Sequence, residues 1–305
     1  MNTLKRWLNT AKSHSRWAVI SVPYLWMLLF FAVPFLIVLK ISFAYQVVAI
    51  PPYTGLLELA DQSVLMKLNL TNYLQLMVED KYIDAYLNSI QIAGISTLLC
   101  LLIGYPMAYT IARLPPTSRN IALMLVILPS WISFLIRIYA WMGILQTNGL
   151  LNKLLLGIGI IDTPLRIMNT PLAAYIGIVY AYLPFMILPL YANLVKLDLR
   201  LLEAAYDLGA RPWKAFLTIT LPLSRRGIVA GCMLVMIPAV GEYVIPELLG
   251  GPSTRMIGRQ LANEFFVAGN WPMASAVAIV MLLLLMVPIL IFNHIQGKEM
   301  EGRLT

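Results

Sequence analysis

The chain has 305 residues, of which 60% are hydrophobic and only 12% are charged, and its formal net charge is +8. Soluble domains carry about 25% charged residues, so this composition excludes a water-soluble globular protein. The basic residues stand in short segments beside apolar runs and not on one soluble face, so we expect no nucleic-acid partner. The composition predicts an all-α protein embedded in a lipid bilayer.

Six apolar runs are long enough for membrane-spanning helices, which need about 20 residues. In chain order they cover residues 22–43, 85–112, 121–145, 172–195, 227–249 and 273–293. A basic segment precedes the first run, but this run is longer than the apolar part of a signal peptide and no cleavage site follows, so we interpret it as a retained span. We therefore expect one multi-pass transmembrane domain over residues 22–294, preceded by a segment of residues 1–21 and followed by a tail of residues 295–305.

The Lys and Arg residues predict the orientation of these spans. Fourteen of the 22 lie before the first run, after the last, or in the two connections on that same side, and seven lie on the opposite side. Cytoplasmic segments carry the excess of basic residues, so both termini are predicted to be cytoplasmic. Residues 44–84 then form an acidic extracytoplasmic segment. It could receive a partner or a cationic solute, or it is simply a solvated loop that avoids positive charge.

The cytoplasmic connection between the fourth and fifth runs, residues 196–226, contains an amphipathic pattern. Four apolar residues repeat at i, i+3, i+4 and i+7 and form one stripe on a helix over residues 199–208: Leu201, Ala204, Ala205 and Leu208. Gly209 follows at a position where helices end with a positive φ, and Pro212 suits the first turn of the next helix. The pattern predicts a helix, a sharp turn and a second helix.

Charged and small residues lie together in this connection. Ala204 and Ala205 would let another protein approach the backbone closely, while Glu203, Asp207 and Arg211 offer charged hydrogen bonds around them. A helix lying on the membrane surface would explain the apolar stripe equally well. It would not explain two acidic residues beside two alanines and a glycine, so we favour a docking element.

Glu242 is a carboxylate deep within the fifth predicted span. A charge at the centre of a span costs about 2.5–3.5 kcal/mol on insertion scales, so such a residue is a functional candidate. Arg137 lies at similar depth in the third span, and two hypotheses stay open: Glu242 attracts a cationic substrate, or it forms a structural ion pair with Arg137. Pro238, Gly241 and Pro246 should break the helix around Glu242, which favours the first hypothesis.

Aromatic residues near these charges could add cation–π contacts to an ammonium group. The candidates for the substrate pathway are Tyr139, Trp141, Tyr182 and Tyr243. Aromatic residues at span ends more often anchor a helix at the membrane interface. The sequence has no P-loop or HExxH motif, and its two histidines lie near opposite ends. We therefore expect no catalytic residue, metal site or cofactor, and no enzymatic activity.

The cytoplasmic connection resembles the signature loop of the permease subunits of ABC importers. The matching anchors are Glu203, Ala204, Ala205, Gly209, Ile219, Leu221 and Pro222. The resemblance implies that this loop, including Asp207 and Arg211, couples the permease to a separate ATP-hydrolysing subunit. It also implies a bacterial inner-membrane complex of this chain with a second permease, two ATP-binding subunits and an extracytoplasmic, periplasmic solute-binding protein.

Sequence segments outside this loop are similar to the permeases of polyamine importers, and most similar to the putrescine type. They lie at residues 104–109, 128–141, 238–251, 256–258 and 270–272. The resemblance implies import of putrescine or a related polyamine. Two alternatives stay open: an ABC importer for another small solute such as an amino acid, and a secondary transporter or channel that needs no ATPase. The second would require inverted repeats or a charged relay through several spans, and we find neither in the sequence.

Overall fold

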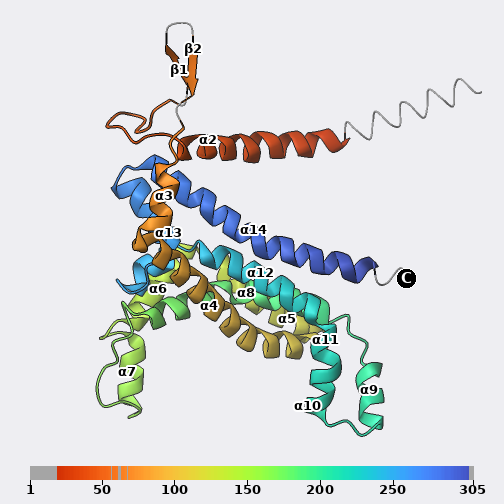
Figure 1. Ribbon diagram of the computed structural model, residues 1–305. Coiled ribbons are helices and arrows are strands. Elements are labelled where there is room, and N and C mark those ends of the chain that lie inside the picture. Colours follow the sequence, from red (N-terminus) through yellow and green to blue (C-terminus); the bar gives the residue numbers. More distant parts are fainter. Residues whose placement is uncertain (1–18, 56, 61–62, 67, 302–305) are drawn as a thin grey trace, which may run out of the picture. The chain divides into compact units, whose positions relative to one another are not determined.

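The computed structural model describes residues 19–55, 57–60, 63–66 and 68–301 (Figure 1). The chain divides into two compact units, one of residues 1–78 with 264–280 and one of residues 79–263 with 281–305. Apart from a short β-hairpin in the first unit, the named elements are helices. The fold class is therefore the predicted one, a predominantly helical protein.

The first unit joins a long apolar helix to short polar elements. The helix covers Val19–Ser42 and includes η1 (Leu28–Ala32) and α2 (Val33–Ser42). It is followed by an antiparallel hairpin of β1 (Leu57–Ala60) and β2 (Ser63–Met66), by α3 (Thr71–Val78), and later in the chain by most of η5 (Asn263–Val267) and the first ten residues of α14 (Trp271–Glu301).

Polar side chains of α3 fix the end of the first helix. The Asn72 amide donates hydrogen bonds to the carbonyl oxygens of Ser42 at 2.9 Å and Ala44 at 3.1 Å. The hydroxyl groups of Tyr73 and Ser42 lie 2.7 Å apart. The two amide bonds satisfy carbonyl groups that the helix end would otherwise leave unpaired.

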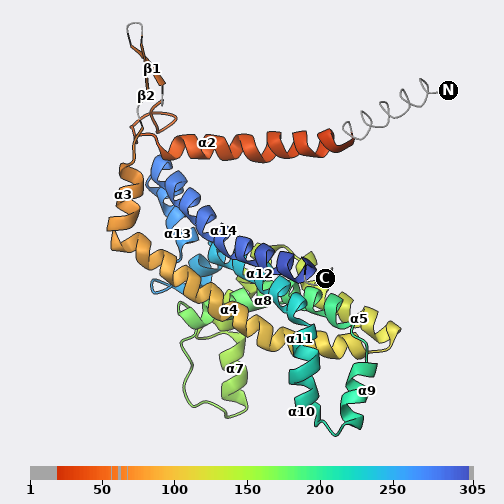
Figure 2. The ribbon, with the colours of Figure 1, turned by 45° about the vertical axis from the view of Figure 1, so that its right-hand side comes forward.

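Three helices run side by side through the second unit (Figure 2): α4 (Asp80–Arg113), α8 (Pro171–Leu194) and α12 (Arg225–Val240). Small residues let their backbones approach. A Cβ added at Gly231 of α12 would lie 2.7 Å from the sulfur of Met186 on α8. In lipid the hydrophobic effect does not drive helices together. Van der Waals contact between closely packed helices stabilises their association instead, and small residues permit it.

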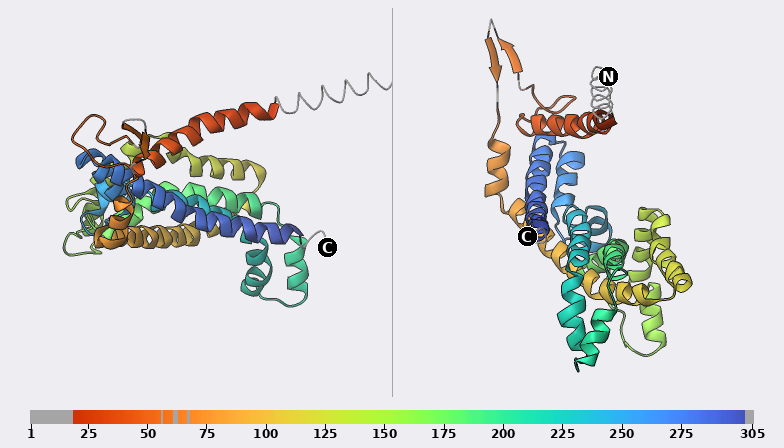
Figure 3. Two further views of the ribbon diagram at one scale, coloured as in Figure 1. Left: turned by 45° about the horizontal axis from the view of Figure 1, so that its top comes forward. Right: turned by 90° about the vertical axis from the view of Figure 1, so that its right-hand side faces the viewer.

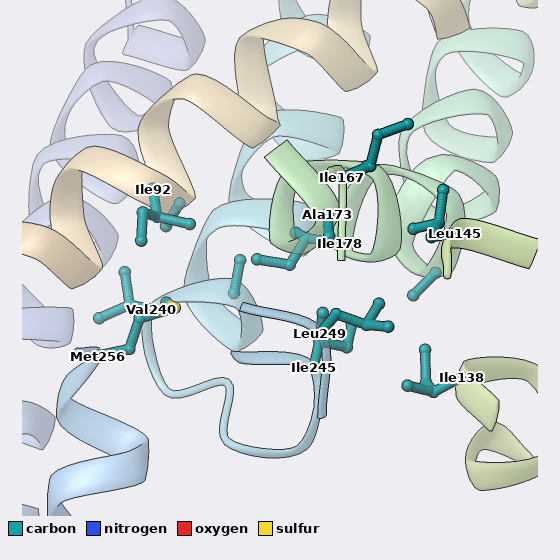
Figure 4. Close-up of a cluster of buried hydrophobic side chains, with 13 residues drawn as sticks. Ile92, Ile138, Leu145, Ile167, Ala173, Ile178, Val240, Ile245, Leu249 and Met256 are labelled. Atoms are coloured by element: carbon teal, nitrogen blue, oxygen red, sulfur yellow. The ribbon is translucent and has the colours of Figure 1, made fainter. Parts of the chain in front are cut away.

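The remaining elements of the second unit surround or extend these helices. They are α5 (Pro116–Ile127), η2 (Leu128–Trp131), α6 (Phe134–Leu145), α7 (Leu150–Gly157), α9 (Arg200–Asp207), α10 (Pro212–Ala215), η3 (Phe216–Thr220), α11 (Leu221–Leu223), η4 (Pro246–Gly250) and α13 (Ile257–Ala262). Figure 4 shows a buried cluster that joins several of them, with Ile138 from α6, Ile178 from α8, Leu249 from η4, and Ile245 directly before η4. This cluster holds η4 against α8.

Four of the predicted spans are continuous helices, and two are bent. The continuous ones cover Val19–Ser42, Asp80–Arg113, Pro171–Leu194 and Trp271–Leu290. The third span corresponds to Pro116–Trp131 and Phe134–Gly157, which meet at 90°. The fifth predicted span, residues 227–249, overlaps Arg225–Val240, which meets Pro212–Leu223 of the preceding connection at 66°. The part of the chain that the structure describes thus has four helices long and apolar enough to cross a membrane, or up to six if each bent pair is one span.

The boundaries of the bent spans correct the sequence prediction. The third run was expected to be one helix, but Ile132 is extended with ψ 142 after the 3-10 turn of η2, which contains Pro129. The fifth run was expected to continue to residue 249, but α12 ends at Val240 and Gly241 lies at its C-terminal cap. The interruption near Gly241 confirms the helix break that the proline and glycine pattern predicted.

The predicted termini are described in part. Residues 1–18 of the expected N-terminal segment lie outside the described residues, while α14 continues to Glu301, so residues 295–301 of the expected tail are helical. The cytoplasmic placement of both ends, the single domain over residues 22–294 and the external placement of residues 44–84 stay predictions.

Candidate functional site

The connection after α8 forms the predicted helix, turn and helix. Gly209 has a φ of 79°, and Pro212 begins α10. The N–H of Gly209 donates to the carbonyl of Tyr206 at 2.8 Å, and the N–H of Ala210 donates to that of Ala205 at 2.9 Å. This pair of hydrogen bonds is the Schellman motif, which ends a helix at a residue of positive φ. We call residues 200–220 the coupling hairpin. Figure 3 shows it projecting from the ends of α8 and α12.

The apolar stripe of α9 faces away from the rest of the chain. Leu201 is 47% exposed and Leu208 is 88% exposed, whereas Leu202, outside the predicted stripe, is 4% exposed. The helix therefore packs against its own chain through Leu202, and its predicted apolar stripe is open. Trp213 on the second arm is also exposed. A surface of this kind is typical of a contact site for another protein or for lipid.

The predicted docking residues share this open surface. Glu203, Ala204, Asp207 and Arg211 are exposed, and Ala205 is half-buried. At the start of α9 the Asp198 carboxylate accepts a hydrogen bond from the N–H of Arg200 at 3.0 Å. This contact satisfies one of the unpaired N–H groups at the helix start, and so the hairpin is fixed at both ends of α9 by local hydrogen bonds.

Glu242 lies in the interruption between α12 and the short helical segment of residues 244–250. Its side chain is buried, with 8% exposed. One carboxylate oxygen accepts hydrogen bonds from the N–H groups of Val244 at 3.1 Å and Ile245 at 3.4 Å. The other accepts a hydrogen bond from the Tyr182 hydroxyl at 2.5 Å. A buried carboxylate is stabilised by such donors and by its place at the start of a helix.

Two contacts with distant segments hold the backbone around Glu242. A Cβ added at Gly258 of α13 would meet the carbonyl oxygen of Gly241 and lie 2.8 Å from that of Glu242. Beside it, the N–H of Ile257 donates to the Ser89 hydroxyl of α4 at 2.7 Å. The sequence interpretation did not identify Gly258 and Ser89 as site residues. Gly258 does belong to residues 256–258, one of the segments that resemble polyamine importer permeases. That resemblance could have identified it as a candidate site residue.

The structure does not bring Arg137 to Glu242. Among the described residues, the partners of the Glu242 carboxylate are Tyr182 and the backbone of residues 244 and 245. The Arg137 guanidinium lies 5.7 Å from the ring centroid of Phe134, and its Nε has no hydrogen-bond partner there. The ion pair is therefore not formed in this conformation of the single chain.

Of the aromatic candidates, Tyr182 is the one whose side chain forms a hydrogen bond with the Glu242 carboxylate among the described residues. Tyr243 is the next residue along the chain and is 39% exposed. Trp141 packs edge-on against Tyr180 with ring centroids 5.3 Å apart, beside the buried cluster. Tyr139 is 56% exposed and is not part of that cluster.

Sequence reasoning overlooked a second carboxylate within the bounds of the fifth predicted span. From the sequence we considered Glu242 alone, whereas Glu247 lies in η4 and forms an ion pair with Arg259 of α13 at 2.5 Å. Arg259 also donates to the carbonyl of Gly251 at 3.0 Å. In the part of the chain that the structure describes, no three His, Cys, Asp or Glu residues gather as a metal site requires.

The sequence is similar to permease proteins of known transport systems. It is 40% identical over 284 residues to the spermidine/putrescine transport system permease protein PotB of Haemophilus influenzae, covering 93% of this chain and 94% of that protein. It is 41% identical over 280 residues to PotB of Escherichia coli, covering 90% of this chain and 97% of that protein.

The fold is similar to that of solved importers. A chain in the crystal structure of a bacterial ABC transporter involved in the import of alginate superposes with a TM-score of 0.69 at 20% identity, covering 96% of this chain and 99% of that one. The family model for the binding-protein-dependent transport system inner membrane component matches residues 100–301. The chain therefore belongs to the binding-protein-dependent transport system inner membrane component family, whose members are multi-pass inner-membrane permeases.

Proposed function

We propose that this chain is a permease subunit of an ATP-driven importer for putrescine or a related polyamine and forms half of the translocation pathway. Its similarity to two PotB proteins over nine-tenths of its length supports a polyamine as the cargo. The observation that carries the proposal is the buried carboxylate of Glu242 at a break in a membrane helix. Broken helices are tolerated in a bilayer where they line a cavity or pack against protein.

Glu242 is proposed to attract the ammonium group of the cargo. Backbone N–H groups and the Tyr182 hydroxyl donate hydrogen bonds to the carboxylate and hold it in its buried position. Among the described residues no cation neutralises it, so its negative charge is left for a cationic ligand. Tyr243 and Trp141 are proposed to line the same pathway, where their ring faces would contact an ammonium group. Tyr139 is exposed on α6 and would act only if the second permease covers that face.

The coupling hairpin is proposed to dock on the ATP-hydrolysing subunit. Its apolar stripe and the charged groups of Glu203, Asp207 and Arg211 are open for a partner. ATP-driven closure of the two ATP-binding subunits would move the hairpins of both permeases and change the orientation of their membrane-spanning helices. Glu203→Arg, which reverses the charge on the docking face, should lower co-purification of the ATPase without lowering the amount of this chain in the membrane.

Uptake measurements test the proposed function. A strain that lacks polyamine import is supplied with the complete transport system, with or without this chain, and uptake of labelled putrescine and spermidine is measured. We expect uptake only when the chain is present. Uptake of a labelled amino acid instead, with no polyamine uptake, would favour the importer for another solute. Competition between the two unlabelled polyamines then separates putrescine from spermidine as the preferred cargo.

Reconstitution of this chain alone in liposomes tests the rival class. A single permease has one coupling hairpin and half of a pathway, so we expect no polyamine flux without the second permease and the ATPase. Polyamine flux through the chain alone without ATP would favour a channel and contradict the importer.

A further inference from the structure

A hollow of about 690 Å³ opens between the end of α8 and the start of α12, beside the coupling hairpin. Its size lies within the range of about 300–1,000 Å³ that is usual for small-molecule sites. Three cationic side chains line it, Lys196, Arg225 and Arg226, against one carboxylate, that of Asp198. The balance of charge favours an anionic ligand.

The charges of this hollow are only partly used within the chain. Among the described residues, neither Lys196 nor Arg225 forms an ion pair. Arg226 is engaged in an interaction of its own. The Asp198 carboxylate accepts a hydrogen bond from the N–H of Arg200, so it serves the start of α9. Lys196 and Arg225 therefore remain for a ligand.

The position of the hollow relative to the spans identifies the kind of anion. Lys196 follows the last residue of α8 by two positions, and Arg225 is the first residue of α12. α8 is a candidate membrane span that ends at Leu194, and α12 begins after a 66° bend from Pro212–Leu223, so we infer that the hydrocarbon layer ends near Lys196 and Arg225. Phospholipid phosphates occupy this level of the bilayer, and clusters of Lys and Arg beside membrane helices attract anionic headgroups.

Apart from Asn193, the uncharged part of the wall is apolar. It consists of Leu197, Leu201, Pro222 and Leu223. A free phosphate ion would gain nothing from this wall, whereas a phospholipid presents a phosphate next to apolar chains. We propose that the hollow binds one anionic phospholipid, with its phosphate between Lys196 and Arg225 and its apolar part against Leu197 and Leu223. The bound lipid would join the ends of α8 and α12 to the base of the coupling hairpin.

Lipid retention by the assembled complex tests this site. The complex of this chain with its partner subunits is exchanged into micelles that contain phosphatidylglycerol and phosphatidylcholine, and bound lipids are counted by native mass spectrometry. Lys196→Gln and Arg225→Gln are tested singly and together. Each should weaken phosphatidylglycerol retention about fivefold, as expected for one basic residue at a membrane surface. Arg200→Gln is the matched control, because Arg200 is exposed on α9 and does not line the hollow.

The expected result is loss of phosphatidylglycerol in the two test variants, with unchanged retention in the control and unchanged phosphatidylcholine throughout. Equal loss in the control would mean a general surface charge effect and would overturn the site. Unchanged retention in both test variants would do so too. If the double variant does not assemble, lipid retention by the two single variants is compared with that of Arg200→Gln.

Two further arms separate the lipid from other anions. Inorganic phosphate should not displace phosphatidylglycerol, and Leu223→Ser should weaken lipid retention. Displacement by phosphate, with no effect of Leu223→Ser, would assign the hollow to a soluble phosphate compound instead. Loss of ATPase co-purification in Lys196→Gln and Arg225→Gln, without change in bound lipid, would assign it to a protein contact.

Discussion

The coupling hairpin and the interruption at Glu242 both separate two helices, but contacts of different range hold them. At the hairpin, the N–H groups of Gly209 and Ala210 bond carbonyls three and five residues earlier, and the outer face of α9 is open. At the interruption, the buried carboxylate of Glu242 meets the hydroxyl of Tyr182, 60 residues away in the chain. One element is built locally, and the other depends on the packing of the whole second unit.

This difference supports the different roles that we propose for the two regions. A locally built, exposed hairpin keeps its shape while its surface contacts another protein, which suits coupling to an ATPase. A buried interruption that distant residues hold in place positions its carboxylate firmly, which suits recognition of a cargo. Changes in the hairpin should therefore affect association with partners, and changes around Glu242 should affect transport or assembly of the fold.

The largest effect is expected for Gly258→Ala. The added Cβ would meet the backbone carbonyls of Gly241 and Glu242, which cannot move aside as a flexible side chain can. We expect the complex to lose about 3 kcal/mol of stability, at the upper end of overpacking effects, and to show no uptake. Thermal unfolding of the purified complex and polyamine uptake measure this.

Gly94→Ala in α4 is the control, because an added Cβ there would meet no atom within 4 Å beyond its chain neighbours and the backbone of its own helix. It should leave both quantities near those of the unmodified complex, since Ala is favoured over Gly in helices. If Gly258→Ala is as stable and active as Gly94→Ala, the backbone at Glu242 is not held by the close approach of α13.

The next largest effect is expected for Glu242→Gln. The amide oxygen of Gln can still accept the N–H bonds of Val244 and Ile245, and its NH₂ group can donate to the Tyr182 hydroxyl, so the change isolates the charge. Uptake should fall about thirtyfold, since a contact with a charged group is worth about 2 kcal/mol, while assembly stays near normal. Combining it with Arg137→Gln should not restore uptake. Restored assembly and uptake in the double variant would show that Glu242 only neutralises Arg137.

Gly209→Val is expected to have an intermediate effect that is confined to coupling. A β-branched residue at a φ of 79° is strained, and this conformation costs L-residues about 1–2 kcal/mol. Co-purification of the ATPase should fall about tenfold, with normal levels of this chain in the membrane. Gly209→Asn is the matched control, because Asn adopts positive φ more readily and should retain most of the association. Equal association in both variants would make the hairpin an ordinary connection.

The smallest effect is expected for Tyr182→Phe. It removes one donor from the Glu242 carboxylate and leaves the two backbone donors in place. Uptake should fall about threefold, which is equivalent to roughly 0.6 kcal/mol and lies at the low end for one hydrogen bond. Unchanged uptake with unchanged cargo affinity would show that Tyr182 does not position the carboxylate.

Local chemistry explains which parts of the fold could be predicted from the sequence. The four continuous spans and the coupling hairpin follow from apolar run length, a glycine at positive φ and a proline at a helix start. The two bent spans could not be predicted from proline alone. Pro106 lies inside α4 and Pro184 inside α8 without ending them, whereas the chain is interrupted after Pro129. Tertiary packing decides where a proline breaks a helix.

The same reasoning explains the outcome at the candidate site. The break around Glu242 was predicted because Pro238, Gly241 and Pro246 are close in sequence. Its partner Tyr182 was proposed only as one of several aromatic residues, since no local pattern links residues 60 positions apart. Ser89 contributes one hydroxyl group, and Gly258 contributes space because it has no side chain. Neither feature produces a periodic pattern that could be recognised in the sequence.

Paired measurements on reconstituted complexes test most directly whether the two regions have separate roles. ATPase association and polyamine uptake are measured in the same preparations of Glu242→Gln and Gly209→Val. We predict that Glu242→Gln keeps its ATPase subunits and loses uptake, whereas Gly209→Val loses both because its ATPase subunits dissociate. Loss of ATPase association in Glu242→Gln, or full uptake by that variant, would contradict the account.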